Sequence, residues 1–349
     1  MYDILISVLI ASISTRKQPQ MYSELHSRSA LLFRPPPPTI STTDNLSNNL
    51  NQDLTFAITG NSTTQNNKIQ HYLHNRPTRQ PLNGKVLLFY HYCTISNPQE
   101  LLLWQQTLCQ LLRLRGRIHV GKEGINGTVG GSLEAIELYK NSFRVHAIWS
   151  NRFKAMEFKE SLGGHHCFPN LFIRVCTEIC QMNASPEQIH WKDTGIHLKP
   201  SEFHAAVQEM NQNKNRNQED IVLLDVRNLY ESNVGHFDGA VRLATRHFTD
   251  FPKIADDLII KHALHTKKKV LMYCTGGIRC ERASSYFRSK GIQTCYQLEG
   301  GIHKYIEEMG NETLFRGKNF VFDRRLTTER VGTALPISQC EYKSDAGAM

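Results

Sequence analysis

The 349-residue chain has no apolar segment long enough to cross a lipid bilayer. The apolar run near its start, Ile4 to Ile13, is about ten residues long, whereas a spanning helix needs about 20. That run also lacks the charge order of a secretory signal, because Asp3 precedes it and the basic residues Arg16 and Lys17 follow it. These absences predict a protein with no membrane partner and a cytoplasmic location.

The chain also lacks the cysteine pattern of a secreted, disulfide-stabilised protein. Its 9 cysteines are odd in number and irregularly spaced, which favours free thiols in a reducing compartment. One group of potential ligands, His165, His166, Cys167, Cys176 and Cys180, contains no Cys-x2-Cys pair, so we predict no metal there. No flavin or iron motif is evident either, and no cofactor is predicted.

Residues 1–80 have too few apolar side chains to form a core. The proline run Pro35–Pro38 is followed by sequence rich in Ser, Thr, Asn and Gln. Such a composition cannot bury enough surface to offset the entropy lost on folding, so we expect a disordered, solvated tail. The rest of the chain, with an overall hydrophobic content of 40%, has room for two ordinary domains.

The first of these domains is expected over residues 85–180. Apolar spacing predicts helices over 98–114 and 133–139, and strands over 86–90, 117–120, 127–129, 153–158 and 171–175. The order β-α-β-β-α-β is typical of a ferredoxin-like α+β domain, with two helices on one face of an antiparallel sheet. The segment Lys122–Thr128 would be its central hairpin, a structural turn rather than a phosphate loop.

The second domain is expected over residues 195–310, after a linker over 181–198 in which Trp191 serves as a packing anchor. Strands over 221–226, 270–273 and 294–298 alternate with helices over 201–210, 251–264, 281–290 and onward from 302, which is the pattern of a parallel α/β sheet. Residues 235–240 are predicted to form a tight turn. The side chains of Arg227 and Glu231 are predicted to pair. Reactive groups in such sheets lie at the carboxyl ends of the strands.

Cys274 occupies that position, between an apolar strand and the start of a helix. Unpaired backbone N–H groups and the helix dipole should face its sulfur, and two glycines let the loop fold around it. With the charge of Arg279, these effects favour a thiolate, so Cys274 is the predicted nucleophile. The loop expected to stabilise an anion on its sulfur consists of Thr275, Gly276, Gly277, Ile278 and Arg279.

The Cys-x4-Arg loop, together with Asp225-Val-Arg227 and Gly235-His236, resembles a rhodanese domain over about 195–310. Cdc25-type phosphatases have a related loop with five intervening residues, so the shorter loop favours sulfur chemistry. The resemblance extends to motifs that occur here in one family's order: Glu123-Gly-Ile-Asn-Gly-Thr128, Asp225-Val-Arg-Asn228, Cys274-Thr-Gly-Gly-Ile-Arg-Cys-Glu281, Leu298-Glu-Gly-Gly-Ile302 and Phe320-Val-Phe-Asp-Arg324. Residues 85–330 thus resemble the tRNA uridine(34) hydroxylases and their animal relatives, the thiosulfate sulfurtransferase/rhodanese-like domain-containing proteins.

The resemblance implies an acylphosphatase-like domain ahead of the rhodanese domain. It also implies a persulfide-forming Cys274, oxygen-dependent hydroxylation of the tRNA wobble uridine, and tRNA and a sulfane sulfur donor as partners. Cys280 is a candidate resolving thiol, with a cysteine packed in the first helical turn as the alternative. Asp225, Arg227 and His236 are expected to brace the site by hydrogen bonds.

Two other functions stay open on the sequence. One is a sulfurtransferase that moves sulfane sulfur to cyanide, a small thiol or a protein, and the other is a non-catalytic binding module that keeps the fold. A formal charge of +9 permits nucleic-acid binding without requiring it. The candidate basic face, whose alternative is ordinary solvated charge, comprises Arg113, Arg115, Arg117, Lys122, Arg316, Lys318, Arg324 and Arg325.

The C-terminal part departs from the family pattern. Members usually continue into a cysteine-rich segment, whereas Cys340 is the only cysteine after Cys295 here. Residues 311–349 are therefore expected to form an extension that is partly disordered and holds no metal. The sequence does not define the oligomeric state.

Overall fold

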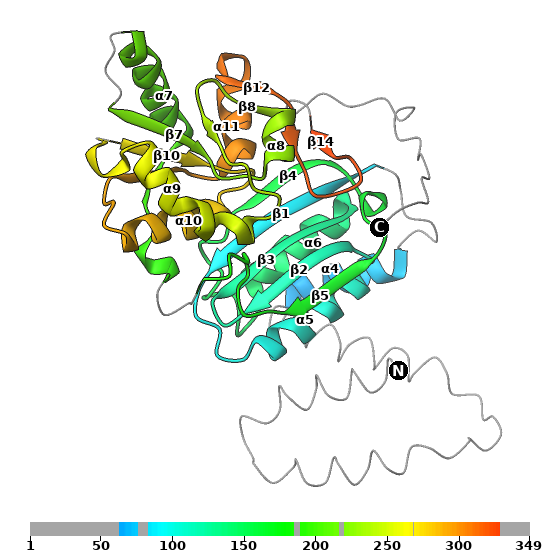
Figure 1. Cartoon of the computed structure of the whole chain (residues 1–349). Helices are drawn as coiled ribbons and strands as arrows, with labels where there is room; N and C mark the ends of the chain where they lie inside the picture. The colour runs from blue at the N-terminus through cyan, green and yellow to red at the C-terminus, as the bar shows by residue number, and fades with distance from the viewer. Residues whose placement is uncertain (1–62, 76–82, 185–188, 216–219, 268, 329–349) are drawn as a thin grey trace, which may run out of the picture.

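The computed structural model describes residues 63–75, 83–184, 189–215, 220–267 and 269–328. They form two units, each built on a five-stranded sheet, and the second unit lies against one face of the first sheet (Figure 1). Among these residues, no helix is long and apolar enough to span a membrane.

The first unit is an α+β domain with sheet order β4-β1-β3-β2-β5. Strands β4, β1, β3 and β2 pair antiparallel, and β5 adds to β2 in parallel. The predicted ferredoxin-like arrangement is confirmed. Its elements are β1 (Gly84–Tyr92), α5 (Pro98–Leu111), β2 (Arg115–Gly121), β3 (Gly124–Ser132), α6 (Leu133–Val145), β4 (Phe158–Gly163), η1 (His165–Cys167) and β5 (Leu171–Val175).

Strand β1 contributes side chains to both faces of this sheet. Leu87 and Phe89 are fully buried in the core beneath α5 and α6. Leu88 and Tyr90 alternate with them, so they point to the opposite face, toward the second unit. Helix α6 begins where the Ser132 hydroxyl accepts the Ala135 N–H, as a helix N-cap does.

The strand predicted over 153–158 is wrong, because β4 begins only at Phe158. Phe153 and Met156 are buried, but they lie in turns: the Phe153 N–H donates to the Trp149 carbonyl and the Met156 N–H to the Phe153 carbonyl, each at 3.0 Å. These apolar side chains therefore pack on the core from a turn-rich segment and not from a strand. Strand β3 likewise begins earlier than predicted, at Gly124.

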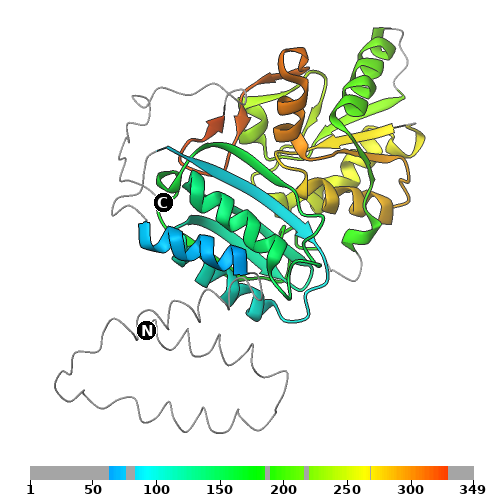
Figure 2. The ribbon, with the colours of Figure 1, turned by 180° about the vertical axis from the view of Figure 1, so that it is seen from behind.

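The disordered tail predicted over residues 1–80 includes a segment that is in fact folded. Residues Thr63–Asn75 form helix α4, which lies beside α6 on the outer side of the unit (Figure 2). Ile69 and Tyr72 are buried in the same core as Phe89, and the Tyr72 hydroxyl donates to the Leu112 carbonyl at 3.3 Å. Residues 1–62 lie outside the described part of the chain.

The second unit is a parallel α/β domain with sheet order β6-β11-β10-β7-β9, as predicted. Helices α9 and α10 contribute to the core on one face, and α7 and α11 to the core on the other. Its elements are η2 (Trp191–Asp193), β6 (Ile196–Leu198), α7 (Pro200–Asn215), β7 (Ile221–Asp225), α8 (Leu229–Val234), β8 (Gly235–Phe237), β9 (Val241–Arg242), η3 (Phe248–Asp250), α9 (Phe251–Lys261), η4 (Leu264–Thr266), β10 (Lys269–Tyr273), α10 (Ile278–Ser289), β11 (Cys295–Leu298) and α11 (Gly301–Met309).

Two segments predicted as irregular take part in sheets. The stretch treated as a linker ends in β6, which pairs with β11 at the edge of the parallel sheet. The predicted turn after α8 contains β8, which pairs antiparallel with β12 (Phe315–Gly317) of the C-terminal extension. The extension continues through η5 (Gly310–Glu312) and the short hairpin of β13 (Asn319–Phe320) and β14 (Thr327–Thr328). Residues 329–349 are outside the described part.

Candidate active site

Cys274 lies at the carboxyl end of the central strand β10, directly before the loop that leads into α10. Its side chain is fully buried, and its sulfur accepts the Gly277 N–H at 3.1 Å. Gly277 has φ +103°, a conformation that side chains rarely adopt, and this lets the loop turn its amide toward the sulfur. The strand–loop–helix setting predicted for Cys274 is therefore present.

The loop around Cys274 stabilises its charged form. Burial alone raises the pKa of a thiol, but a hydrogen bond from the Cys280 thiol, the Arg279 charge and the backbone N–H groups of Cys280 and Arg279 outweigh it. Together they lower the pKa of Cys274 to about 5. At neutral pH the sulfur is thus a thiolate, the nucleophilic form of cysteine.

Cys280 lies in the first turn of α10 and is fully buried beside Cys274. Burial raises its pKa, and its hydrogen bond to the Cys274 sulfur raises it further, so Cys280 keeps its proton. A protonated thiol that donates to a thiolate stabilises the charge on its neighbour. The role of Cys280 as a resolving thiol stays a prediction.

Arg279 is held by Glu231, a residue for which the sequence suggested a different partner. Its guanidinium donates to both Glu231 oxygens, at 2.6 and 2.7 Å, and to the Thr275 hydroxyl at 3.2 Å. Glu231 is fully buried in α8, where it also accepts the Asn228 N–H. The predicted pairing of Arg227 with Glu231 is therefore wrong, and Glu231 fixes the charged group that faces Cys274.

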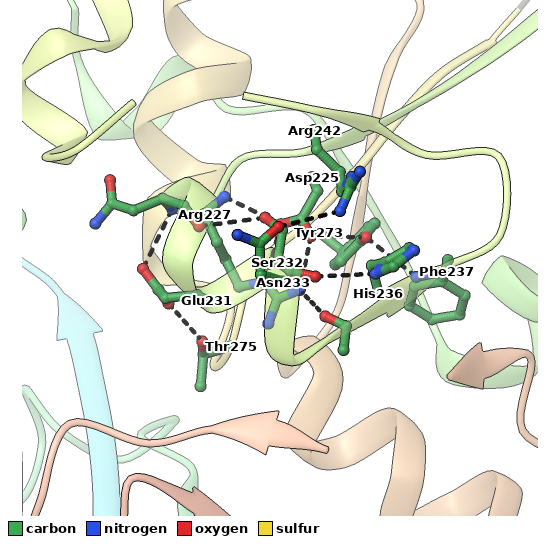
Figure 3. Close-up of polar contacts among 12 residues, drawn as sticks. Asp225, Arg227, Glu231, Ser232, Asn233, His236, Phe237, Arg242, Tyr273 and Thr275 are labelled. Carbon is green, nitrogen blue, oxygen red and sulfur yellow. Dashed lines mark hydrogen bonds and ion pairs between the residues drawn. The ribbon is translucent and has the colours of Figure 1, made fainter. Parts of the chain in front are cut away.

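Arg227 pairs instead with Asp225, and both side chains are fully buried (Figure 3). The Arg227 guanidinium donates to the two Asp225 oxygens at 2.9 and 2.6 Å, and the Tyr273 hydroxyl donates to Asp225 at 2.8 Å. These bonds join the ends of β7 and β10 directly before Cys274. The His236 ring nitrogen, in β8, lies 2.9 Å from the carbonyl oxygen of Ser232 in the preceding helix α8.

The first unit covers the Cys274 loop through strand β1. A Cβ atom on Gly276 would lie 2.8 Å from the Leu88 side chain, and one on Gly277 would lie 2.7 Å from the Tyr90 hydroxyl. Tyr90 also donates to Glu281 of α10 at 3.1 Å. The two glycines thus let the sheet of one unit close over the reactive loop of the other.

A buried arginine of α10 also joins the two units. The Arg282 guanidinium donates to Glu178 at 3.2 Å and to the Ile189 carbonyl at 2.9 Å, and it lies 3.5 Å from Glu123. Glu123 in turn accepts the Ile179 N–H at 2.8 Å. Sequence motifs contain Glu123 and lie next to Arg282, but pattern alone did not show that they meet across the interface.

The C-terminal extension also reaches the site. The ring of Phe322 lies beneath the Arg279 guanidinium, 5.5 Å from ring centroid to Cζ. Arg325 belongs to the predicted basic face, but it donates to Asp323, to the Ser161 hydroxyl and to the Leu162 carbonyl. Its charge is therefore committed to holding the extension on β4.

The histidine and cysteine group near residues 165–180 does not form a ligand cluster. Cys167 packs in a small core with Val86 and Phe168. Within the ranges that the structure describes, no three His, Cys, Asp or Glu side chains are grouped so that they could hold a metal ion.

The fold and this site define a rhodanese-like domain preceded by an acylphosphatase-like one. Residues 84–179 match the UPF0176 acylphosphatase-like domain, and residues 206–308 match the rhodanese-like domain. A solved Saccharomyces cerevisiae homolog of single-domain rhodanese and the Cdc25 phosphatase catalytic domain is 19% identical, covering 37% of this chain and 91% of its own, with a TM-score of 0.28.

Relatives of known name match across both units. The tRNA uridine(34) hydroxylase of Corynebacterium aurimucosum is 39% identical over 251 residues, which cover 70% of this chain and 77% of that protein. The Cytophaga hutchinsonii protein of the same name is 40% identical over 247 residues, covering 70% and 72%. The chain belongs to the tRNA uridine(34) hydroxylase family.

Proposed function

We propose that this protein is a cysteine-dependent enzyme that hydroxylates uridine 34 of tRNA, with Cys274 as the reactive group. Dioxygen would supply the hydroxyl oxygen, and an external two-electron reductant would convert its second oxygen atom to water. The observation that carries the proposal is the buried Cys274 thiolate, held by loop amides and Arg279 where the two family domains meet. Relatives that match both domains carry the name of this activity. A reducing, cytoplasmic compartment suits this chemistry, because all eight cysteines in the described ranges are free.

The uracil ring has a carbon atom with which a thiolate such as that of Cys274 can react. Its C6 is electron-poor through conjugation with the C4 carbonyl, so a thiolate adds there to form a C–S bond while the displaced electron pair moves to the carbonyl oxygen. The loop amides and Arg279 keep the sulfur charged until it reacts. Asp225, Arg227 and Tyr273 hold the strand end that positions it.

Nucleoside mass spectrometry of tRNA tests the proposal directly. Cells that lack the protein are supplied with the wild type, with Cys274→Ser, or with Cys295→Ser as a control. Cys295 is also fully buried in the same core, but burial raises its pKa to about 12, so it stays a thiol. We expect 5-hydroxyuridine with the wild type and Cys295→Ser but not with Cys274→Ser. Equal 5-hydroxyuridine in cells without the protein, or full rescue by Cys274→Ser, would overturn it.

One observation favours a second function, sulfur transfer. The Gly277 N–H donates to the Cys274 sulfur, and a loop of this kind can also hold the outer sulfur of a persulfide. In this reaction the thiolate attacks the outer sulfur of thiosulfate, a new S–S bond forms as the old one breaks, and sulfite leaves with the electron pair. Thiocyanate formed from thiosulfate and cyanide, lost in Cys274→Ser and kept in Cys295→Ser, would support it. A wild-type protein that forms none would argue against it.

A further inference from the structure

A cavity of about 450 Å³ lies between the two units, and Tyr90 in its wall also packs against Gly277 of the Cys274 loop. Tyr90, Tyr92 and Lys159 line it from the first sheet. Trp191, His197 and Glu281 line it from the second unit and its connection. Its size is in the range of pockets that hold a small molecule or a single nucleotide.

One wall of this cavity is aromatic and is built from both units. Trp191 stacks on Tyr92 with ring centroids 6.0 Å apart and planes at 18°, and Tyr90 meets Tyr92 edge-on at 6.1 Å. All three side chains are only partly buried, because they face this space. Such a surface suits a flat, unsaturated ring, which gains stacking energy without a fixed hydrogen-bond pattern.

Lys159 of β4 is the second observation that points to a ligand. It is only 7% exposed, yet its ammonium has no hydrogen bond or ion pair with any residue that the structure describes. The ammonium lies over the ring of Tyr90, 5.3 Å from nitrogen to centroid, and it is also near enough to the Glu157 and Glu299 carboxylates for their charges to act on it. A buried ammonium is costly without an acceptor, so the cavity is suited to a ligand that supplies one.

The three carboxylates that line the cavity, those of Glu157, Glu281 and Glu299, already have partners. Glu281 accepts from the Tyr90 hydroxyl at 3.1 Å and the Thr194 hydroxyl at 2.6 Å, and it pairs with His197 at 2.9 Å. Glu157 and Glu299 both pair with Lys304. The carboxylates therefore frame the cavity, and Lys159 is a buried cation in its wall with no hydrogen bond or ion pair among the described residues. At the rim, exposed Lys192 lies over the Trp191 ring at 5.5 Å, where a cation would face a phosphate.

We infer that this cavity binds one pyrimidine nucleotide turned out of an RNA loop, with its ring against Tyr92 and Trp191, a ring carbonyl oxygen on Lys159 and its phosphate toward Lys192. The inference rests on the proposed function, because it places the target uridine in a cavity whose wall residue Tyr90 packs against the Cys274 loop. A base in a single-stranded loop costs little to unstack, and an anticodon presents such bases.

The test measures RNA binding in the full-length chain with Cys274→Ser as the background, so that no reaction intervenes. The probe is an anticodon stem-loop RNA with uridine at position 34, titrated by calorimetry. Loss of one stacking contact should weaken binding about 5- to 150-fold in Trp191→Ala. Lys159→Met should weaken it about tenfold or more, with partial recovery in Lys159→Arg. Lys253→Met, an exposed lysine of α9 outside the cavity, is the matched control and should bind as the background does.

A change in the RNA serves as a second test that does not depend on the folding of any variant. The same stem-loop without a base at position 34 should bind the unaltered cavity about 5- to 150-fold more weakly. Equal affinity for the two RNAs, or unchanged affinity in Trp191→Ala and Lys159→Met, would overturn the assignment. These outcomes are separate from the Cys274 test. Cells supplied with Cys274→Ser can lack 5-hydroxyuridine, which supports the proposed function, while the cavity variants show no change in RNA affinity, which would overturn only the cavity assignment.

Discussion

Replacing Cys280 by alanine should raise the pKa of Cys274, because the Cys280 thiol donates a hydrogen bond to the Cys274 sulfur. Hydrogen bonds to charged groups contribute about 1.5–3 kcal/mol, and an S–H group is a weak donor, so we take the low end. At about 1.4 kcal/mol for each pKa unit, the expected rise is about one unit above the present value of about 5. The thiolate fraction at pH 5 should then fall about fivefold, while at pH 8 it should hardly change.

The assay is alkylation of Cys274 by iodoacetamide, followed by peptide mass spectrometry across this pH range. Because Cys274 is fully buried, the absolute rate also depends on how readily iodoacetamide reaches the sulfur. The ratio of the rates at pH 5 and pH 8 within each protein removes that factor. Cys280→Ser, which keeps a hydroxyl donor, should retain a midpoint near that of the wild type. A Cys280→Ala midpoint equal to that of the wild type would refute the role of this hydrogen bond.

Three further outcomes follow from the same geometry. Glu231→Gln leaves the buried Arg279 guanidinium without its charge partner and should lower the free energy of unfolding, measured in urea, by about 3–5 kcal/mol. Glu209→Gln, in the exposed pair with Lys269, is the control and should lower it by about 1 kcal/mol or less. Equal losses in the two variants would contradict this. Gly276→Ala places a methyl group 2.8 Å from Leu88 and should cost about 1–3 kcal/mol, most of which a second change, Leu88→Ala, should restore; strictly additive losses would count against the contact. Hydrogen bonding to a carboxylate raises the pKa of His197, so the stability that it adds should be full below its unfolded pKa of about 6.5 and lost as the pH rises through the folded value. The difference in melting temperature between wild type and His197→Gln should therefore shrink as the pH rises, and a difference that grows would exclude this linkage.

The fold of both units was largely predictable because their signals are local. The continuous apolar strand Ile221–Asp225 and the strand Lys269–Tyr273 have the composition of strands buried on both faces, and each is an interior strand of the parallel sheet. The mistaken strand over 153–158 shows the limit of such patterns. A short apolar cluster does not distinguish a strand from a turn that packs on the core.

The site was predictable only where its parts are adjacent in the chain. Cys274, its glycines and Arg279 fall within one strand–loop–helix segment, so their placement followed from sequence. The partner of Arg279 did not, because Glu231 is 48 residues away and resembles any helical glutamate. The contact of Tyr90 with Glu281 spans 191 residues. It depends on how two folded units dock, which periodicity does not encode.

The cover that Leu88 and Tyr90 place over the Cys274 loop has a consequence for the oxidation of Cys274. Thiolates are the form of cysteine that peroxides oxidise, first reversibly to sulfenic acid and then irreversibly to sulfinic acid. A cysteine with a pKa of about 5 is charged at all times in a neutral cell and would be steadily damaged if it faced solvent. With the sheet of the first unit closed over it, the sulfur is shielded while idle. Oxidants can then reach it only where the contacts of Leu88 and Tyr90 with the loop are broken.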